Sequence, residues 1–242
     1  MTREADVVRA LVEMADTLVD DYDVVDVLTG MTGRCVDLLN ASAAGVMLAS
    51  SSGRLGLVAS SSEAMRLLEL FELQTEEGPC LDAFRSGETV AHEVLTAQPG
   101  RWPSFAAAAL QAGFKSAFAI PLRWHDRTIG ALNLLSMHAE PMAEPDRIVA
   151  RAFADLAAVS ITQHRATAEA RRLNEQLSAA LSSRIVIEQA KGVLSERAGV
   201  GLAEAFARLR RYARNENLRL TDVARAAVDG SLPASAWQPS DT

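Results

Sequence analysis

A long run without helix-breaking residues is the feature that most restricts the fold of this chain. After Asp146 the next proline is Pro233, and the first glycine is Gly192. Within this run, apolar residues recur every seven positions and also occupy an intervening position in three heptads. The first series is Val159, Ala166, Leu173, Ala180, Ile187 and Leu194, and the second contains Leu156, Ala170 and Leu177. Such a pattern predicts a signalling helix over 146–183 that associates with a second helix as a coiled coil.

The first 145 residues alternate between amphipathic helical patterns and short apolar strands. Apolar residues at helical spacing predict helices over 3–19, 24–39, 65–73, 79–85 and 101–114. Short apolar runs bounded by turn residues predict strands over 43–50, 55–61, 88–91, 114–124 and 127–137. Residues 1–145 are therefore expected to form an α+β domain, and the helix that follows should extend this domain to about residue 165.

Beyond the long helix the sequence predicts a small helical module. The GVG segment at 199–201 breaks the helix, and a second helix with a regular apolar stripe follows it. NEN ends that helix, and a third is expected from Thr221. The tail, 231–242, is predicted to be disordered.

Charge is distributed unevenly along the chain. Residues 1–170 contain 13 Lys+Arg against 23 Asp+Glu, a formal net charge of −10, whereas residues 171–230 contain 11 against 7, a net charge of +4. An acidic body with a basic end is typical of a protein whose end binds a polyanion, although a solvated helix surface gives the same counts. Composition alone therefore leaves both interpretations open.

Cysteine usage and hydropathy indicate the compartment. Cys35 and Cys80 lie far apart in the sequence and outside any metal-binding or redox spacing, which is typical of a reduced, cytoplasmic protein. The N-terminus has no apolar run suited to export, and no stretch approaches the roughly 20 apolar residues that cross a membrane. The four histidines lack metal-ligand spacing, and no catalytic motif is present, so we expect neither a metal site nor an enzyme.

The basic end carries a set of residues that occur together in one family. They are Ile187, Gln189, Ala190, Lys191, Gly192, Leu194, Ala205, Phe206, Leu209, Arg210, Ala213, Leu220, Val223 and Ala224. Through them, residues 182–230 resemble the ANTAR domain, an RNA-binding output module of bacterial signalling proteins. Gly201 stands where the family often has Ser or Thr as a helix cap, a departure that should cost a few tenths of a kcal/mol.

The preceding region contains GPCLDAF (78–84), RWPSFAAAALQAGFKSAFAIPL (101–122) and IGALNLLS (129–136). These segments resemble the GAF domain, which actinobacterial proteins commonly join to an ANTAR domain. The resemblance implies an antiparallel sheet flanked by helices, then a long coiled-coil helix, then a three-helix ANTAR module. It implies a sensor for a small-molecule ligand, a redox state or a protein partner, and it leaves the cofactor unknown because GAF domains bind many molecules and some bind none.

Together the resemblances imply an actinobacterial-type regulator of transcription antitermination. In such proteins a homodimer presents two ANTAR modules to tandem RNA hairpins in a nascent leader transcript, and the stabilised RNA excludes an overlapping terminator. Arginine suits this task because its planar guanidinium group binds phosphate through two hydrogen bonds and stacks on unpaired bases. Two alternatives stay open. One is a DNA-binding regulator, because three short basic helices imitate a helix-turn-helix. The other is a GAF methionine sulfoxide reductase that uses cysteines.

Six residues of the basic end are candidates for RNA contact: Arg184, Lys191, Arg208, Arg211, Tyr212 and Arg214. Arg184 and Lys191 occupy seam positions where a coiled coil prefers apolar side chains, so the seam should open there. Their ordinary alternatives are an interhelical ion pair and a solvated lysine.

The other four candidates lie on the middle helix of the module. Arg208, Arg211 and Arg214 are expected on its outer side, and Tyr212 beside them could supply a ring for base stacking. The plainer alternative is a solvated helix surface with a tyrosine at the edge of the core.

Cys80 is the candidate sensor residue of the first domain. It follows a Gly-Pro turn at the start of a helix, where the helix dipole would lower the pKa of an exposed thiol. The alternative is a small, buried core residue.

Overall fold

The computed structural model describes residues 2–16, 23–92, 95 and 100–233. The chain divides into two compact units, Met1–Ala166 and Thr167–Thr242. Helix α6 (Glu144–Ala198) contributes its first part to one unit and its second part to the other. The helix predicted over 146–183 is thus present, and it continues through Ser182 and Ser183.

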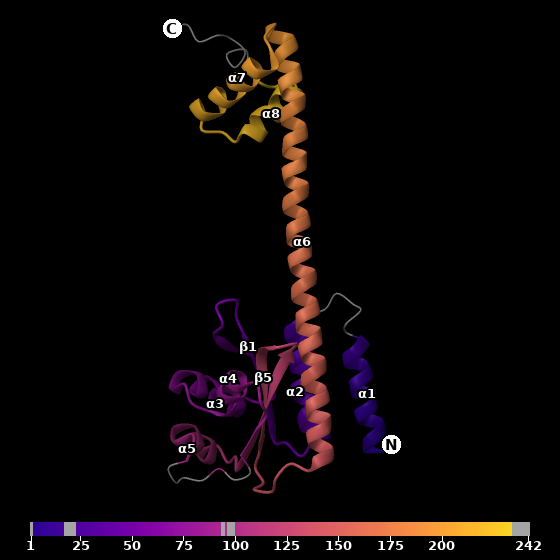
Figure 1. The fold of residues 1–242 in the computed structure, drawn as a ribbon, viewed down its shortest axis with the longest axis vertical. Helices are drawn as coiled ribbons and strands as arrows, with labels where there is room; N and C mark the ends of the chain where they lie inside the picture. Colours follow the sequence, from indigo (N-terminus) through magenta and orange to yellow (C-terminus); the bar gives the residue numbers. More distant parts are fainter. Residues whose placement is uncertain (1, 17–22, 93–94, 96–99, 234–242) are drawn as a thin grey trace. The chain divides into compact units, whose positions relative to one another are not determined.

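A five-stranded sheet forms the centre of the first unit (Figure 1). Its strands are β1 (Ala43–Ala49), β2 (Leu55–Ser60), β3 (Val90–His92), β4 (Ser116–Trp124) and β5 (Arg127–Ser136), in the spatial order β2-β1-β5-β4-β3. Each neighbouring pair of strands is antiparallel. The predicted α+β class and the antiparallel sheet are therefore confirmed.

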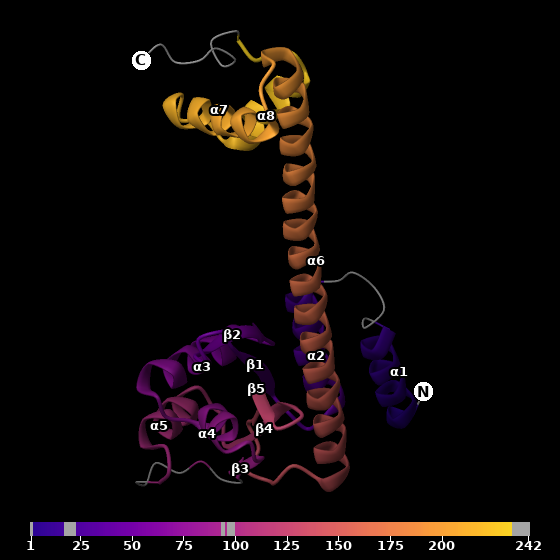
Figure 2. The ribbon, with the colours of Figure 1, turned by 45° about the horizontal axis from the view of Figure 1, so that its top comes forward.

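Helices cover both faces of this sheet (Figures 1 and 2). One face carries α1 (Arg3–Asp16), α2 (Val24–Leu38) and the first part of α6, and the other carries α3 (Glu63–Thr75), α4 (Pro79–Ser86) and α5 (Pro103–Gln111). Because side chains alternate along a strand, the strands β1, β4 and β5 each contribute to both cores. On β5, Leu132 and Leu134 join the core beneath α2 and α6, whereas Ala131 and Leu135 join the core beneath α3, α4 and α5.

Local signals explain where several helices of the first unit begin and end. The Asp23 carboxylate accepts a hydrogen bond from the Val25 N–H over 2.7 Å at the start of α2, and Ser62 caps α3 in the same way. Pro79 begins α4, where a missing N–H is tolerated. Gly87, with a φ of 70°, ends α4 in the left-handed conformation that glycine adopts readily.

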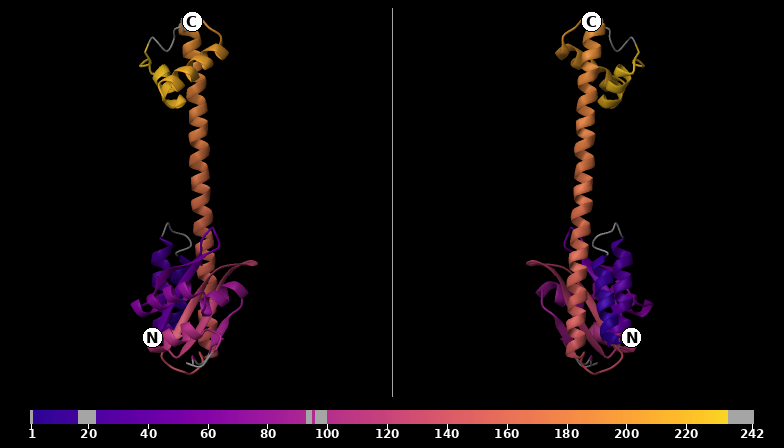
Figure 3. Two further views of the ribbon diagram at one scale, coloured as in Figure 1. Left: turned by 90° about the vertical axis from the view of Figure 1, so that its left-hand side faces the viewer. Right: turned by 90° about the vertical axis from the view of Figure 1, so that its right-hand side faces the viewer.

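The second unit is a three-helix module. Helices α7 (Leu202–Asn215) and α8 (Leu220–Val228) lie beside the last turns of α6 (Figure 3). Their common core contains Ala190, Leu194, Ala205, Leu209, Ala213, Val223, Ala224, Ala227 and Leu232. Gly199, with a φ of 60°, ends α6 and allows the chain to turn toward α7.

The heptad series of α6 differs from the prediction at its two ends. Leu156 packs against the core of the first unit, Ile187 packs against the core of the second, and Leu194 is buried in that core. These seam residues are therefore internal to their own units. Between them, four large apolar side chains are more than half exposed: Leu173, Leu177, Leu181 and Ile185. Leu173 and Leu177 belong to the predicted seam, whereas Leu181 and Ile185 continue the exposed stripe at a spacing of four residues.

Candidate nucleic-acid interface and sensor interior

The outer face of α7 gathers three exposed arginines around one shallow hollow. The hollow is lined by Ala207, Arg210, Arg211, Arg214 and Asn215. Their spacing of three and four residues places them on one helical face, opposite the stripe that the helix buries. Guanidinium groups bind phosphate oxygens through paired hydrogen bonds, so a polyanion fits this face. The sequence analysis named Arg211 and Arg214 as candidates for RNA contact and did not name Arg210. The spacing of four residues between Arg210 and Arg214 could have shown that they share a helical face.

Arg208 is buried, in contrast to its predicted place on the outer side of α7. Its Nε donates a hydrogen bond to the Glu204 carboxylate over 2.9 Å, and its side chain is 10% exposed. Glu204 lies one turn earlier on the same helix, and Arg208 directly precedes the core residue Leu209. The aliphatic stem of Arg208 therefore packs with the core, while its charge is paired.

Lys191 and Arg184 have different environments on α6. The Lys191 ammonium lies 2.8 Å from Glu188 Oε2 and 5.7 Å from the centroid of the Phe206 ring, and its side chain is 19% exposed. Arg184, one heptad earlier, is exposed. An incoming phosphate must compete with Glu188 for Lys191, whereas no such pairing is seen for Arg184 among the described residues.

Tyr212 lies at the edge of the module's core. Its ring is half-buried and packs against the apolar cluster of α6, α7 and α8. This position matches the plainer alternative, a core-edge tyrosine, because only part of the ring is available to a base.

Beneath α3, the core of the first unit contains polar side chains that the sequence did not reveal. Glu69 and Glu72 of α3 and Asn133 of β5 are fully buried. Both carboxyl oxygens of Glu69 and both polar atoms of the Asn133 amide have no hydrogen-bond partner within the described part of the chain. Asn133 pairs with Gly45 across the sheet, and a Cβ atom at Gly45 would overlap the Glu69 carboxyl group. Glycine at position 45 therefore makes room for Glu69.

The second carboxyl group, that of Glu72, contacts the start of α4. Its Oε1 accepts a hydrogen bond from the Leu81 N–H over 2.9 Å. Burial raises the pKa of Glu72 to about 8, although the backbone N–H groups of Leu81 and Cys80 act in the opposite direction. Burial, and then the neighbouring Glu72 charge, raise the pKa of Glu69 well above its ordinary value. Both side chains therefore favour the neutral acid form inside this core.

Cys80 is completely buried in the same core, at the second residue of α4. Burial raises the pKa of its thiol, and the Glu72 and Glu69 charges act in the same direction. The predicted helix-dipole effect requires an exposed thiol, and Cys80 instead occupies the alternative position, that of a small, buried core residue. Cys35 belongs to the core on the opposite face of the sheet, where burial raises its pKa to about 12.

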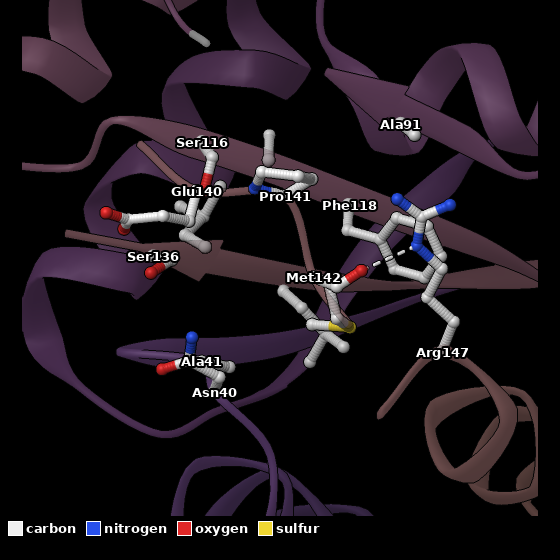
Figure 4. A pocket seen from close by; sticks show the side chains of 13 residues that line it. Asn40, Ala41, Ala91, Ser116, Phe118, Ser136, Glu140, Pro141, Met142 and Arg147 are labelled. Carbon is white, nitrogen blue, oxygen red and sulfur yellow. Dashed lines mark hydrogen bonds between the residues drawn. The ribbon is translucent and has the colours of Figure 1, made fainter. Parts of the chain in front are cut away.

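A small cavity lies on that opposite face, near the start of α6 (Figure 4). Arg147 borders it: its Nε donates a hydrogen bond to the Met142 carbonyl over 2.8 Å, and its guanidinium group lies 5.7 Å from the centroid of the Phe118 ring. The cavity volume of about 20 Å³ corresponds to about one water molecule. It is too small for an organic ligand.

Metal-binding clusters and membrane-spanning helices are both absent from the described ranges. No group of three His, Cys, Asp or Glu side chains there is arranged to hold a metal ion. None of the helices in those ranges combines the length and the apolar character needed to cross a bilayer.

The first unit is thus an antiparallel sheet between two helical layers, and along the chain a three-helix module with an arginine face follows it. A family model of the GAF domain matches residues 21–162, more than half of the chain, and the chain belongs to this family. A model of the ANTAR domain matches residues 175–228. The order of the two domains is that of a GAF–ANTAR regulator, as the sequence predicted.

Solved structures with the same fold support the GAF assignment. The free methionine-R-sulfoxide reductase from Neisseria meningitidis shares 20% identity with a TM-score of 0.53, over 69% of this chain and 95% of that chain. The GAF domains of phosphoenolpyruvate-protein phosphotransferases from Acinetobacter and Coxiella burnetii share 14% identity each, with TM-scores of 0.51 and 0.52. They cover 69% and 67% of this chain, and 97% and 96% of their own chains. No curated protein is significantly similar to the chain in sequence.

Proposed function

We propose that this chain is an RNA-binding regulator that binds tandem hairpin loops in nascent leader transcripts and promotes transcription antitermination. The observation that carries the proposal is the outer face of α7 in the ANTAR domain, where Arg210, Arg211 and Arg214 surround one hollow. Phosphate contacts supply most of the affinity for RNA, and unpaired loop bases supply specificity. Arg184 and Lys191 of α6 extend this cationic set.

The regulator acts as a homodimer in this proposal. This is supported by the exposed stripe of Leu173, Leu177, Leu181 and Ile185. Exposure of four large apolar side chains to water is energetically unfavourable for a single helix. A second copy of the same helix is the partner that a heptad pattern selects. Replacing both Leu173 and Leu177 with Glu should shift the protein toward monomer in sedimentation velocity. Leu202→Glu, which alters an exposed leucine outside the stripe, should leave the mass unchanged.

The GAF domain receives the signal in this proposal, and α6 transmits it as a change in dimer geometry or register. A ligand, a redox state or a protein partner could supply the signal. The burial of Cys35 and Cys80 in cores on opposite faces of the sheet favours a regulator over a cysteine-dependent sulfoxide reductase. Such a reductase needs thiols that reach each other and the substrate.

Selection of bound RNA from a library of leader transcripts tests the function. We expect enrichment of paired hairpins, and the enriched leader should then show increased read-through of its terminator when the protein is added to a transcription reaction. Lys191→Ala and Arg211→Ala should weaken binding without unfolding the protein. Unchanged affinity in both variants would overturn the assignment of the site, and no preference for looped RNA over other polyanions would overturn the function.

Duplex DNA serves as the competitor that separates the DNA-binding alternative. A DNA reader of the helix-turn-helix type would insert α8, where Arg225 is exposed. Arg225→Ala is therefore the matched control: it removes one exposed arginine of the same domain and should leave hairpin affinity unchanged. If Arg225→Ala lost binding and duplex DNA displaced the hairpin, the domain would be a DNA reader.

A further inference from the structure

Two neighbouring hollows on the ANTAR domain share two arginines. The first is the hollow lined by Ala207, Arg210, Arg211, Arg214 and Asn215. The second is lined by Arg210, Ala213, Arg214, Asn217, Leu218 and Leu220. Among the described residues, no carboxylate lines either hollow. Because both hollows contain Arg210 and Arg214, a single ligand can occupy the two together.

The two hollows differ in chemistry. Three guanidinium groups line the first, which suits a phosphate group. The second has apolar walls from Ala213, Leu218 and Leu220, and its polar edge consists of the Asn217 amide and the two shared arginines. A nucleobase has the matching composition: its flat faces stack on apolar or guanidinium surfaces, and an amide can pair with the donors and acceptors on its edge.

Leu218 is 51% exposed and yet held in position by the backbone. Asn217 adopts the left-handed conformation with a φ of 53°, and the Leu218 N–H donates a hydrogen bond to the Ala213 carbonyl over 2.8 Å. This bond closes the end of α7 as a helix-capping motif. An apolar group that is already ordered loses little conformational freedom when a ligand covers it. The cap therefore presents Leu218 as a preformed contact surface.

We propose that the second hollow holds one unstacked base of the RNA loop while the first holds the adjacent phosphate. Leu218 and the shared guanidinium groups contact the face of the base, and the Asn217 amide contacts its edge. Base selection by α7 then resides at its C-terminal cap, and the exposed arginines supply affinity that does not depend on sequence. This inference rests on the proposed function, because it assigns the recognition of the RNA loop to particular residues.

Binding of the full-length protein to the selected hairpin RNA, measured by fluorescence anisotropy over a range of salt, tests the assignment. Leu218→Ala should weaken binding to the hairpin by roughly 5- to 30-fold and leave the salt dependence unchanged, because it removes stacking and no charge. Asn217→Gly keeps the left-handed backbone and removes the amide. It should reduce the preference for the native loop over loops with substituted bases by roughly 5-fold or more. Arg211→Ala should instead weaken binding to all loops alike and lower the salt slope by about one unit.

Leu202→Ala is the matched control, since Leu202 is 54% exposed in the same domain and lines neither hollow. Equal losses in Leu202→Ala and Leu218→Ala would overturn the base pocket. An unchanged loop preference in Asn217→Gly would overturn the base pocket as well. If circular dichroism shows that Leu218→Ala is misfolded, Asn217→Gly alone tests the pocket. In these cases the wild type still binds looped RNA and the proposed function stands. A wild type without any preference for looped RNA would instead overturn the proposed function.

Discussion

Replacing Glu72 with glutamine should flatten the pH dependence of the stability of the first unit. Glu72 is fully buried, and burial raises its pKa from 4.5 to about 8. Between these two values the folded protein keeps a proton on this carboxyl group that the unfolded chain has released. The free energy of unfolding therefore falls as the pH rises through this window. The stabilisation is fully present below 4.5 and is lost once the pH passes about 8.

The magnitude follows from the width of this window. One bound proton changes the free energy of unfolding by about 1.4 kcal/mol per pH unit. The interval from 4.5 to about 8 therefore amounts to roughly 5 kcal/mol for Glu72 alone. Glu69 contributes in the same direction, because its pKa is also raised. A glutamine at position 72 retains the side-chain size and an oxygen for the Leu81 N–H, so it removes the titration and keeps this contact.

Urea unfolding at several pH values between about 5 and 8 measures the effect, with the fluorescence of the buried Trp102 as the reporter for the first unit. The slope of the free energy of unfolding against pH should be shallower in Glu72→Gln by about 1.4 kcal/mol per pH unit. Glu88→Gln, which replaces an exposed carboxyl group, should retain the wild-type slope. A Glu72→Gln protein with the same slope as the wild type would refute the reasoning.

Four further predictions concern packing and capping. Gly45→Ala should lower the free energy of unfolding by about 1 to 3 kcal/mol, because the new Cβ overlaps the Glu69 carboxyl group; in urea unfolding, purely additive effects of Gly45→Ala and Glu69→Ala would contradict this contact. Arg208→Ala should destabilise the second unit by about 1 to 2 kcal/mol in thermal circular dichroism, since it removes a buried stem and an ion pair; Arg211→Ala should not, and the reverse order would reject the burial of Arg208. Cys35 and Cys80 should resist maleimide labelling in the native protein at neutral pH, as mass spectrometry can determine, because burial raises the pKa of both thiols; rapid native labelling of either would show that it is accessible. Gly201→Ser should raise the free energy of unfolding of the second unit by a few tenths of a kcal/mol, because the N-cap of α7 has an extended backbone and no side-chain bond; a lower midpoint of thermal unfolding would count against it.

The positions of several helices were predictable because proline, glycine and capping residues mark their ends. Ser62 caps α3, Pro79 and Pro103 begin α4 and α5, and Gly199 ends α6. These residues act through their own backbone preferences, which do not depend on the rest of the fold. Capping and backbone conformation are therefore visible in a single sequence.

The buried carboxyl groups of α3 were not predicted, although their spacing was visible. Met65, Leu68, Glu69 and Glu72 lie three and four residues apart and so share one helical face, and that face is the buried one. A glutamate is rarely fully buried, so the residue type alone favours a solvated position. The opposite occurs at Leu67 of the same helix, an apolar residue that is exposed. The space for Glu69 and Glu72 comes from Gly45 and Gly78, which lie in other segments of the chain. These contacts form only in the tertiary structure, so the sequence pattern of α3 does not reveal them.

The exposed arginine face of helix α7 could be predicted only in part. Arg208 and Arg210 flank the core residue Leu209, each about 100° around the helix from it, so helical geometry alone does not show that Arg208 is the buried one. The structure makes them different: Arg208 is covered and paired with Glu204, whereas Arg210 is exposed and lines both hollows. The exposed face is therefore displaced toward Arg210 and Arg214. This displacement brings the cationic face next to the helix cap with Leu218, and the base pocket that we propose lies where the two meet.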